Sequence, residues 1–195
     1  IPPMIRLVVP FTAGASTDVF ARRLAAALAP RLHANIIVEN RPGASGMIGA
    51  SAVAKAPKDG SQLLFGSVSL VSAAALMNHA SVDMLEDLTP VAVTGEGPLV
   101  VVVPANSSIK TPQDLVAAAR AHPDKLTHGT GGIGTIAHVA VEMLNSQAGI
   151  QIMHVPYKGA APAVTDTVGG QLDVMFAAQA TFAGQLQAGQ LRAIA

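Results

Sequence analysis

Residues 5–18 read IRLVVPFTAGASTD: a β-branched run, then a turn of small residues, then the start of an Ala-rich helix expected over residues 18–31. The same succession recurs at residues 35–55, 62–79, 126–147, 150–168 and 172–188. Short apolar strands that alternate with helices are typical of parallel sheets covered by helices on both faces. The sequence therefore predicts an α/β fold with mostly parallel sheets.

A break in this pattern divides the 195-residue chain near Glu96-Gly97-Pro98. Strands are predicted on both sides of the break, at residues 89–94 and 99–104, and a last strand at residues 191–195. Two sheets are more usual than one sheet of this many strands. We therefore expect two lobes, residues 1–97 and residues 98–195, with the strand at 99–104 crossing between them.

The composition excludes several classes of function. Twelve basic and twelve acidic side chains leave no net charge, whereas a nucleic-acid binder needs a basic face. The absence of cysteine removes disulfides, thiolate metal sites and a cysteine nucleophile. The longest apolar run, residues 99–103, is far below the roughly 20 residues of a membrane-spanning helix. Since no charged and apolar leader opens the sequence, we expect an export signal to be lacking or already removed.

The turns between strands and helices are the places where a ligand is expected. Ligands of open parallel sheets bind beyond the carboxyl ends of the strands, where helix N-termini offer free N–H groups and a partial positive charge. Small or hydroxyl residues occupy these turns here: Thr12, Gly14, Ala15, Ser16, Ser67, Ser69, Thr130, Gly131, Gly132 and Thr135. Such turns bind anions without Lys or Arg. The alternative is that Ser and Thr only cap the helices.

The sharpest local motif is Gly129-Thr130-Gly131-Gly132-Ile133-Gly134, a G-x-G-x-x-G between a strand and a helix. This is the context of a dinucleotide fingerprint. Its acidic partner about 20 residues on is missing, although Lys158 would suit a 2′-phosphate. A small anion on this turn is the preferred interpretation, and a dinucleotide-dependent oxidoreductase remains the alternative.

Nothing in the sequence points to a nucleophile or a metal centre. A G-x-S-x-G elbow is absent. His138 and Glu142 share a helix face, which we interpret as a hydrogen-bonded pair rather than as metal ligands. His128 and His154 lie on predicted strands and are interpreted as satisfied core histidines. Asp18 is expected to act on the helix N-terminus through its charge, and Arg22-Arg23 to be a solvated helix face. We predict a non-enzymatic protein with no metal and no cofactor.

Five stretches together resemble one family. They are the opening stretch at residues 5–18, VENRPGASG at 38–46, KDG at 58–60, GTGGIGT at 129–135 and HVPYKG at 154–159. In order and spacing they are similar to the Bug-type substrate-binding proteins of tripartite tricarboxylate transporters. The resemblance implies two Rossmann-like lobes of the type II periplasmic-binding-protein kind, a periplasmic location, a small carboxylate ligand and delivery of that ligand to a membrane permease. It also implies a hinge that closes the lobes.

The resemblance further implies which residues bind the carboxylate through backbone amides and hydroxyls. Carried onto this chain, they are Phe11, Thr12, Gly14, Ala15 and Ser16 from the first turn, Ser67 and Ser69 beside it, and Thr130, Gly132, Gly134, Thr135 and Ala177 from the second lobe. Ala15 replaces a second glycine of the family. Ala177 replaces a common Asp, so a ligand with an ammonium group is not favoured.

The family members are longer than this chain, and lobe one is expected to lack its C-terminal closing segment. Full-length members are expected to be monomers, whereas this chain could form a dimer or a swapped assembly. A truncated, non-binding paralogue that self-associates through an exposed sheet edge is therefore a further alternative.

Overall fold

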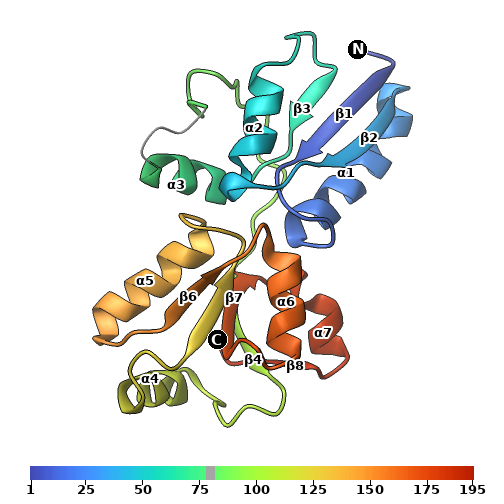
Figure 1. Ribbon diagram of the computed structural model, residues 1–195. Helices are drawn as coiled ribbons and strands as arrows, with labels where there is room; N and C mark the ends of the chain where they lie inside the picture. The colour runs from blue at the N-terminus through green and yellow to red at the C-terminus, as the bar shows by residue number, and fades with distance from the viewer. Residues whose placement is uncertain (78–81) are drawn as a thin grey trace.

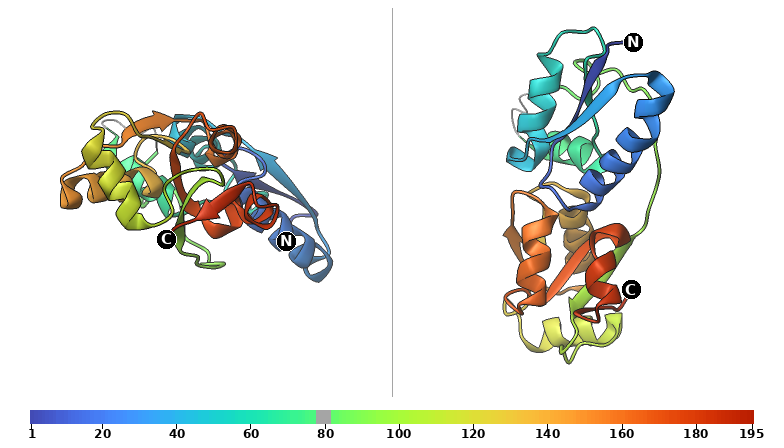
Figure 2. Two further views of the ribbon diagram at one scale, coloured as in Figure 1. Left: turned by 90° about the horizontal axis from the view of Figure 1, so that it is seen from below. Right: turned by 90° about the vertical axis from the view of Figure 1, so that its right-hand side faces the viewer.

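The computed structural model describes residues 1–77 and 82–195 and shows two groups of elements, each built on its own sheet (Figure 1). We call the elements between residues 4 and 76 the N-lobe and those between residues 99 and 193 the C-lobe. Residues 82–98 connect them along one side of the molecule (Figure 2). None of the helices in these ranges is long and apolar enough to cross a membrane.

The N-lobe contains a three-stranded parallel sheet in the order β2-β1-β3. Each strand is followed by a helix, so that the elements succeed one another as β1 (Met4–Val9), α1 (Ser16–Leu32), β2 (Asn35–Asn40), α2 (Met47–Ala54), β3 (Gln62–Leu64) and α3 (Val68–Leu76). A short 3-10 turn, Ala44–Gly46, precedes α2. All three strands therefore end on the same side of the sheet, the side where the helices begin.

The C-lobe contains a five-stranded sheet in the order β6-β5-β7-β4-β8. Its strands are β4 (Leu99–Pro104), β5 (Thr127–Thr130), β6 (Met153–Pro156), β7 (Val174–Ala178) and β8 (Leu191–Ala193). Strands β5, β6 and β7 are parallel, whereas β4 is antiparallel to both β7 and β8. Its helices are α4 (Pro112–Ala121), α5 (Ile136–Ala148), α6 (Ala160–Val168) and α7 (Ala183–Gln187).

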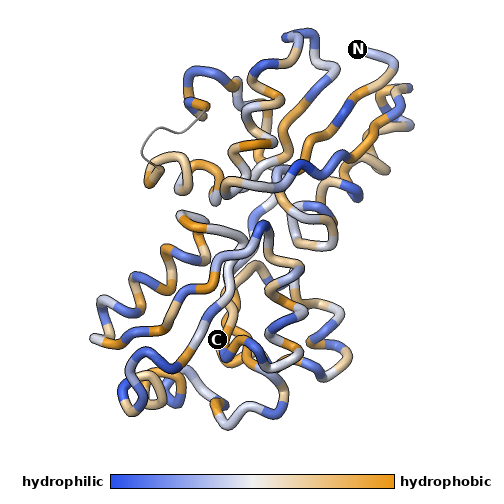
Figure 3. The backbone as a smooth tube through the Cα atoms, viewed as in Figure 1, coloured by the Kyte–Doolittle hydropathy of each residue, from blue (hydrophilic) through white to orange (hydrophobic). Residues whose placement is uncertain are grey.

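The alternation of side chains along β4 explains why both faces of the C-lobe sheet are covered. Val103 packs with Leu115 of α4 and Val141 of α5, whereas its neighbour Val102 packs on the other face with Ala163 of α6. Successive side chains of a strand point to opposite faces, so an apolar run fills two cores. Figure 3 shows the hydrophobic stretches gathered inside both lobes.

Comparison with the sequence predictions confirms the α/β class and the mostly parallel sheets. The predicted strand at residues 89–94 is wrong: these residues pair with no strand, and Val91 and Val93 are both 83% exposed. β-branched residues favour a strand only where a neighbouring strand is present to pair with them. The predicted end of the third helix near His79 lies outside the described residues.

Candidate ligand-binding site

The N-lobe and the C-lobe meet at the carboxyl ends of their strands, along a seam of turns and helix N-termini (Figure 1). In the seam, Ser72 Oγ of α3 donates a hydrogen bond to the Gly134 carbonyl (2.7 Å), and the Ile136 amide of α5 donates to Ser69 Oγ (3.2 Å). A β-carbon added at Gly132 would lie 2.7 Å from Ser45 Oγ. Two turns form the centre of the seam. We call residues 11–16 the first glycine turn and residues 129–135 the second glycine turn.

The helices that begin at the seam lack side-chain caps. The N-cap residues of α1, α3 and α5 are Ala15, Ser67 and Thr135, and none of them makes a capping hydrogen bond with its side chain. Helix α4 begins away from the seam and has a complete capping box with Thr111. The hydroxyls of Ser67 and Thr135 therefore do not cap their own helices, whereas Ser69 Oγ accepts from the Ile136 amide at the start of α5. The other first-turn amides of these helices remain available to an anion.

The first glycine turn is held by its backbone. Gly14 has a φ of +83°, which glycine adopts at little cost, and its amide donates to Asp18 Oδ2 (2.9 Å). The Phe11 carbonyl accepts from Asn40 Nδ2 (3.1 Å). The Phe11 ring is buried with Met47 in the N-lobe core, so Phe11 presents only its backbone to the seam.

Asp18 is the centre of a charged network behind this turn. Its side chain is buried, and its carboxylate accepts from Gly14, from Asn40 Nδ2 (2.9 Å) and from Arg22 (3.0 Å). Burial by itself would raise the pKa of Asp18, but the hydrogen bonds from Arg22, Gly14 and Asn40 outweigh it and leave the pKa lowered. Arg22 and Arg23 are exposed, as predicted for a solvated helix face, and Arg22 in addition donates to Asn40 Oδ1 (3.1 Å).

The remaining residues predicted in the N-lobe lie at different depths. Ala15 is buried, Thr12 and Ser16 are half-buried, and Ser67 is exposed at the start of α3. Thr12 Oγ1 is buried and has no hydrogen-bond partner among the described residues. A β-carbon added at Gly159, in the turn before α6, would lie 2.9 Å from the Thr12 amide nitrogen. Thr12 is therefore the point where the first glycine turn touches the C-lobe.

The second glycine turn is buried and internally bonded. Thr135 Oγ1 donates to the Gly132 carbonyl (2.8 Å), and the Gly132 amide donates to Thr130 Oγ1 (3.2 Å). Gly134 has a φ of +77°, and its amide donates to His138 Nδ1 (3.1 Å). The hydroxyls of Thr130 and Thr135 thus shape the turn, and Ala177 lies buried on β7 in the C-lobe core.

Three histidine rings are stacked behind the second glycine turn. The ring centroid of His154 lies 4.1 Å from that of His138 and 4.9 Å from that of His128. His154 Nε2 lies 2.6 Å from Thr130 Oγ1. His128 is fully buried, and neither of its ring nitrogens has a partner among the described residues. The prediction that His128 is a satisfied core histidine is therefore wrong.

Two of the three rings, His128 and His154, stay uncharged near neutral pH. Burial, and then the charges of His154 and His138, lower the pKa of His128 to about 3. Burial and then the charge of His138 lower the pKa of His154 to about 4. Parallel rings direct their nitrogens side by side rather than toward one point, and within residues 1–77 and 82–195 no group of three His, Asp or Glu side chains could hold a metal ion.

The turn before α6 is held by Tyr157. Its hydroxyl donates to Asp166 Oδ2 (2.5 Å), and burial together with this carboxylate raises the pKa of Tyr157 to about 12. The bond joins the residue that follows β6 to the middle of α6. It thereby holds the Tyr157-Lys158-Gly159 segment against the first glycine turn.

Sequence reasoning missed several residues of the seam: Asn40, Ser45, Ser72, His138 and Gly159. Asn40, Ser45 and Gly159 stood in recognised motifs but were not assigned a role. For His138 a signal existed, because it lies four residues after Gly134 just as Asp18 lies four residues after Gly14. Ser72 gave no local signal, since only the approach of the other lobe makes it a seam residue.

The fold and the seam define the class of two-lobed α/β binding proteins with a site between the lobes. The sequence model of the tripartite tricarboxylate transporter family receptor matches residues 20–195. The chain belongs to this family. It is 37% identical to Protein BugT of Bordetella pertussis over 193 residues, which are 98% of the chain and 59% of BugT.

Solved structures agree. Rpa4515 of R. palustris, solved with adipate, is 33% identical with a TM-score of 0.95, over 98% of this chain and 64% of that one. MatC of Rhodopseudomonas palustris, solved with malate, is 30% identical with a TM-score of 0.92, over 98% of this chain and 65% of that one. The chain thus spans between 59% and 65% of the length of these relatives. A further solved structure, the periplasmic binding protein BugD, is 30% identical with a TM-score of 0.91, over 99% of this chain and 65% of that one. Two of these relatives were thus solved with a carboxylate, adipate or malate.

Proposed function

We propose that the chain is the ligand-binding part of an extracytoplasmic solute-binding protein that captures a small carboxylate between the N-lobe and the C-lobe. The acid is passed to the membrane permease of a tripartite tricarboxylate-type transporter. The protein works in the periplasm, catalyses no reaction and needs no cofactor or nucleic acid. The family membership and the adipate and malate found with relatives support this proposal.

The observation that carries the proposal is the meeting of uncapped helix N-termini from both lobes. Helices α1 and α3 begin at the seam from one side and α5 begins there from the other, each without a side-chain cap. An anion placed between them gains hydrogen bonds from free amides and the favourable ends of three helix dipoles. No Lys or Arg is required, which suits a chain whose basic residues are few.

We further propose that residues 1–97 and 98–195 move as two units about residues 98–104. The seam bonds from Ser72 to Gly134 and from Ile136 to Ser69 hold the lobes against each other. A ligand favours this arrangement only by binding it better than the open one. The ligand-binding residues are those predicted from the sequence, with Phe11 acting through its backbone. Because Ala177 offers no carboxylate, acids without an ammonium group are preferred.

The oxidoreductase alternative gains no support from the geometry. Gly129, Thr130, Gly132 and Gly134 are all buried, and a β-carbon on Gly132 would meet Ser45 of the N-lobe. A dinucleotide pyrophosphate needs the amides of such a turn to be open along its length. A self-associating, non-binding chain remains the outcome to be tested against acid binding.

The proposal is tested by thermal shift and calorimetry with adipate, malate, succinate, citrate and glutamate, and with NADH as the rival ligand. An acid at about 100 times its Kd should add about 2.7 kcal/mol to the free energy of unfolding. Stabilisation by a dicarboxylate and none by NADH is expected. If no acid stabilises the chain, or if NADH alone does, the proposal fails. Light scattering on the same samples separates a binding monomer from a non-binding dimer.

Thr12→Val provides the matched variant. The substitution removes the hydroxyl whose oxygen has no partner among the described residues and keeps the shape of the side chain. Acid binding should weaken by about 1 kcal/mol, which is roughly fivefold. Thr165→Val, on an exposed position of α6, should leave affinity unchanged. Equal affinities of the two variants would exclude the Thr12 hydroxyl from the site.

A further inference from the structure

The hydrogen bond from the Gly134 amide to His138 Nδ1 (3.1 Å) fixes the protonation of that ring. A ring nitrogen that accepts a hydrogen bond must carry a lone pair, so the neutral His138 holds its hydrogen on Nε2. Nε2 faces Glu142 Oε1 at 3.8 Å, one helical turn further along α5. A proton added to His138 would therefore go to Nδ1, the atom that the Gly134 amide occupies.

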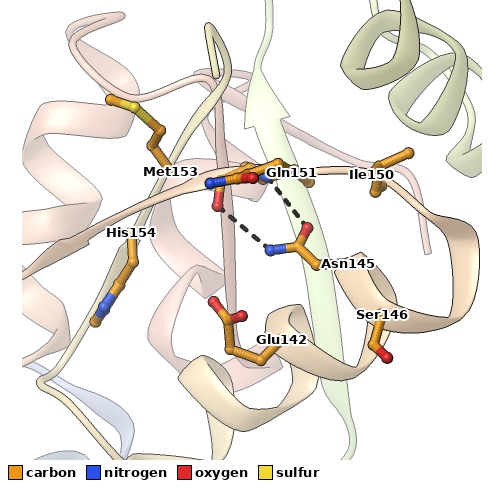
Figure 4. A pocket seen from close by; sticks show the side chains of 8 residues that line it. Glu142, Asn145, Ser146, Ile150, Gln151, Met153 and His154 are labelled. Carbon is orange, nitrogen blue, oxygen red and sulfur yellow. Dashed lines mark hydrogen bonds between the residues drawn. The ribbon is translucent and has the colours of Figure 1, made fainter. Parts of the chain in front are cut away.

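The groups that surround His138 come from four directions. His154 of β6 is stacked on His138, with 4.1 Å between the ring centroids, and the ring centroid of His128 of β5 lies 6.5 Å from that of His138. From α5 itself comes Glu142, which lines a surface pocket beside α5 together with His154 (Figure 4). Residues 68–76 of α3, which pack against α5, contain no titratable side chain. Among these described neighbours of His138, Glu142 is thus the only one with a carboxylate.

The other two histidines do not compete for the proton. The pKa of His154 is lowered to about 4 and that of His128 to about 3, in both cases mainly by burial. Both rings therefore stay neutral between about pH 5 and pH 8. Of the three rings, His138 is the one with a nitrogen near a carboxylate, Glu142 Oε1 at 3.8 Å.

We propose that His138 is a positioning residue that makes ligand capture by the second glycine turn dependent on pH. The neutral ring holds the Gly134 amide, and the protonated ring repels it because Nδ1 then carries a hydrogen. This inference rests on the proposed function, since it concerns the affinity for the same carboxylate. The N-lobe has the same bond from Gly14 to Asp18, but there the acceptor is a carboxylate paired with Arg22.

The repulsion is transmitted to the seam through Gly134 itself. Its amide faces His138, while its carbonyl accepts the hydrogen bond from Ser72 of the other lobe. The amide and the carbonyl of Gly134 are separated only by its Cα, and the φ of the residue is +77°. A backbone rotation at Gly134 that moves the amide away from His138 therefore also turns the carbonyl. Acidification therefore loosens the second glycine turn and the closed arrangement together, and affinity falls as pH falls.

The test measures the Kd for adipate and malate at about pH 8 and about pH 5.5 in the wild-type chain and in H138N, H138A and H122N. We expect the wild type to bind about tenfold more weakly at the lower pH. The reason is that the hydrogen bond from Gly134 to His138 is replaced by a repulsion between two N–H groups. An Asn at 138 places an oxygen close to the position of Nδ1 and does not titrate. H138N should thus recover most of the affinity that H138A loses at about pH 8, and its affinity should not fall with pH.

The control variant H122N removes an exposed histidine at the end of α4, and its pH profile should match that of the wild type. An equal fall of affinity in the wild type and in H138N would overturn the proposal. So would a wild-type affinity that does not change between the two pH values.

A ligand-free measurement separates this inference from the proposed function. In ¹⁵N NMR spectra, the Gly134 amide resonance should move with the same midpoint as the His138 ring, and it should stay fixed in H138N. A Gly134 amide that does not respond to pH overturns the inference even if acids bind. If no acid of the panel binds at about pH 8, the proposed function fails, whatever the Gly134 resonance does.

Discussion

The first and second glycine turns solve the same structural problem with different chemistry. In each, a glycine with positive φ precedes a helix without a side-chain cap, and its amide donates to the side chain four residues later. The N-lobe uses Asp18, buried and clamped by Arg22 and Asn40. The C-lobe uses His138, at the open end of a histidine stack. The first glycine turn is held by a carboxylate that is paired with Arg22. The second glycine turn is held by an imidazole nitrogen, whose lone pair is lost when that nitrogen is protonated.

The largest expected effect comes from removing the acceptor of the first turn. Asp18→Ala leaves the Gly14 amide without its acceptor, Asn40 Nδ2 without one of its two acceptors, and Arg22 without its ion pair. The free energy of unfolding should fall by about 3 kcal/mol in urea titrations. Asp114→Ala removes an exposed carboxylate from the capping box of α4 and should cost only about 1 kcal/mol. Similar losses in the two variants would show that the network does not stabilise the turn.

The next effect compares the two glycines directly. A β-carbon on Gly134 would lie 2.8 Å from the Cα of Ala73, whereas one on Gly14 meets nothing within 4 Å. Both substitutions to Ala strain a positive φ, at about 1 kcal/mol. Gly134→Ala adds a collision between the lobes, so its cost should reach between about 2 and 3 kcal/mol.

Calorimetric unfolding and small-angle scattering of G134A and G14A check this difference. G134A should also be more extended than the wild type, because the closed seam cannot form, while G14A should keep the wild-type dimensions. A G134A protein that is as compact as G14A would contradict the seam described above.

A smaller effect, about 2 kcal/mol, concerns acid stability. The pKa of His128 is about 3 in the folded chain and near 6.5 when unfolded. Between these values the unfolded chain binds more protons, so stability falls as pH falls. From pH 7 to pH 5 the loss due to His128 should be about 2 kcal/mol. Asp18, whose pKa is lowered from 3.8, contributes stability that is fully present above that value and is lost only at more acidic pH.

His128→Phe keeps a flat ring in the stack and removes the titrating group. Its unfolding free energy should therefore change by about 2 kcal/mol less than that of the wild type over the same interval. Urea titrations at the two pH values measure this directly. If the free energy of unfolding changes equally between the two pH values in H128F and in the wild type, His128 is not held neutral by its burial.

Local patterns were sufficient for most of the fold. The β-branched runs, the Gly turns and the Ala-rich stretches located the strands and helices of both lobes, and Thr111 with Pro112 marked the start of α4. Local patterns failed at residues 89–94, because a strand also needs a neighbour that no local sequence contains. They also failed for the antiparallel direction of β4, which depends on how the chain returns to the sheet.

The candidate site was predicted only in part. Thr130 and Thr135 were identified as hydroxyl donors, but the structure shows these hydroxyls bonded within their own turn. Their supporting partners come from distant segments: Asn40 reaches the Phe11 carbonyl across 29 positions of sequence, and Ser72 reaches Gly134 across 62. Such pairs have no periodicity or spacing that a single sequence would reveal.

The sequence by itself determined the α/β class, the two glycine turns and the family, because each depends on short stretches whose residue types dictate backbone shape. Only the tertiary structure decided which lone pairs and amides meet: Asp18 with Gly14, His138 with Gly134, and three imidazoles in one stack. The physical reason is that hydrogen bonds and burial act over a few ångströms in space, and the fold sets those distances independently of separation along the chain.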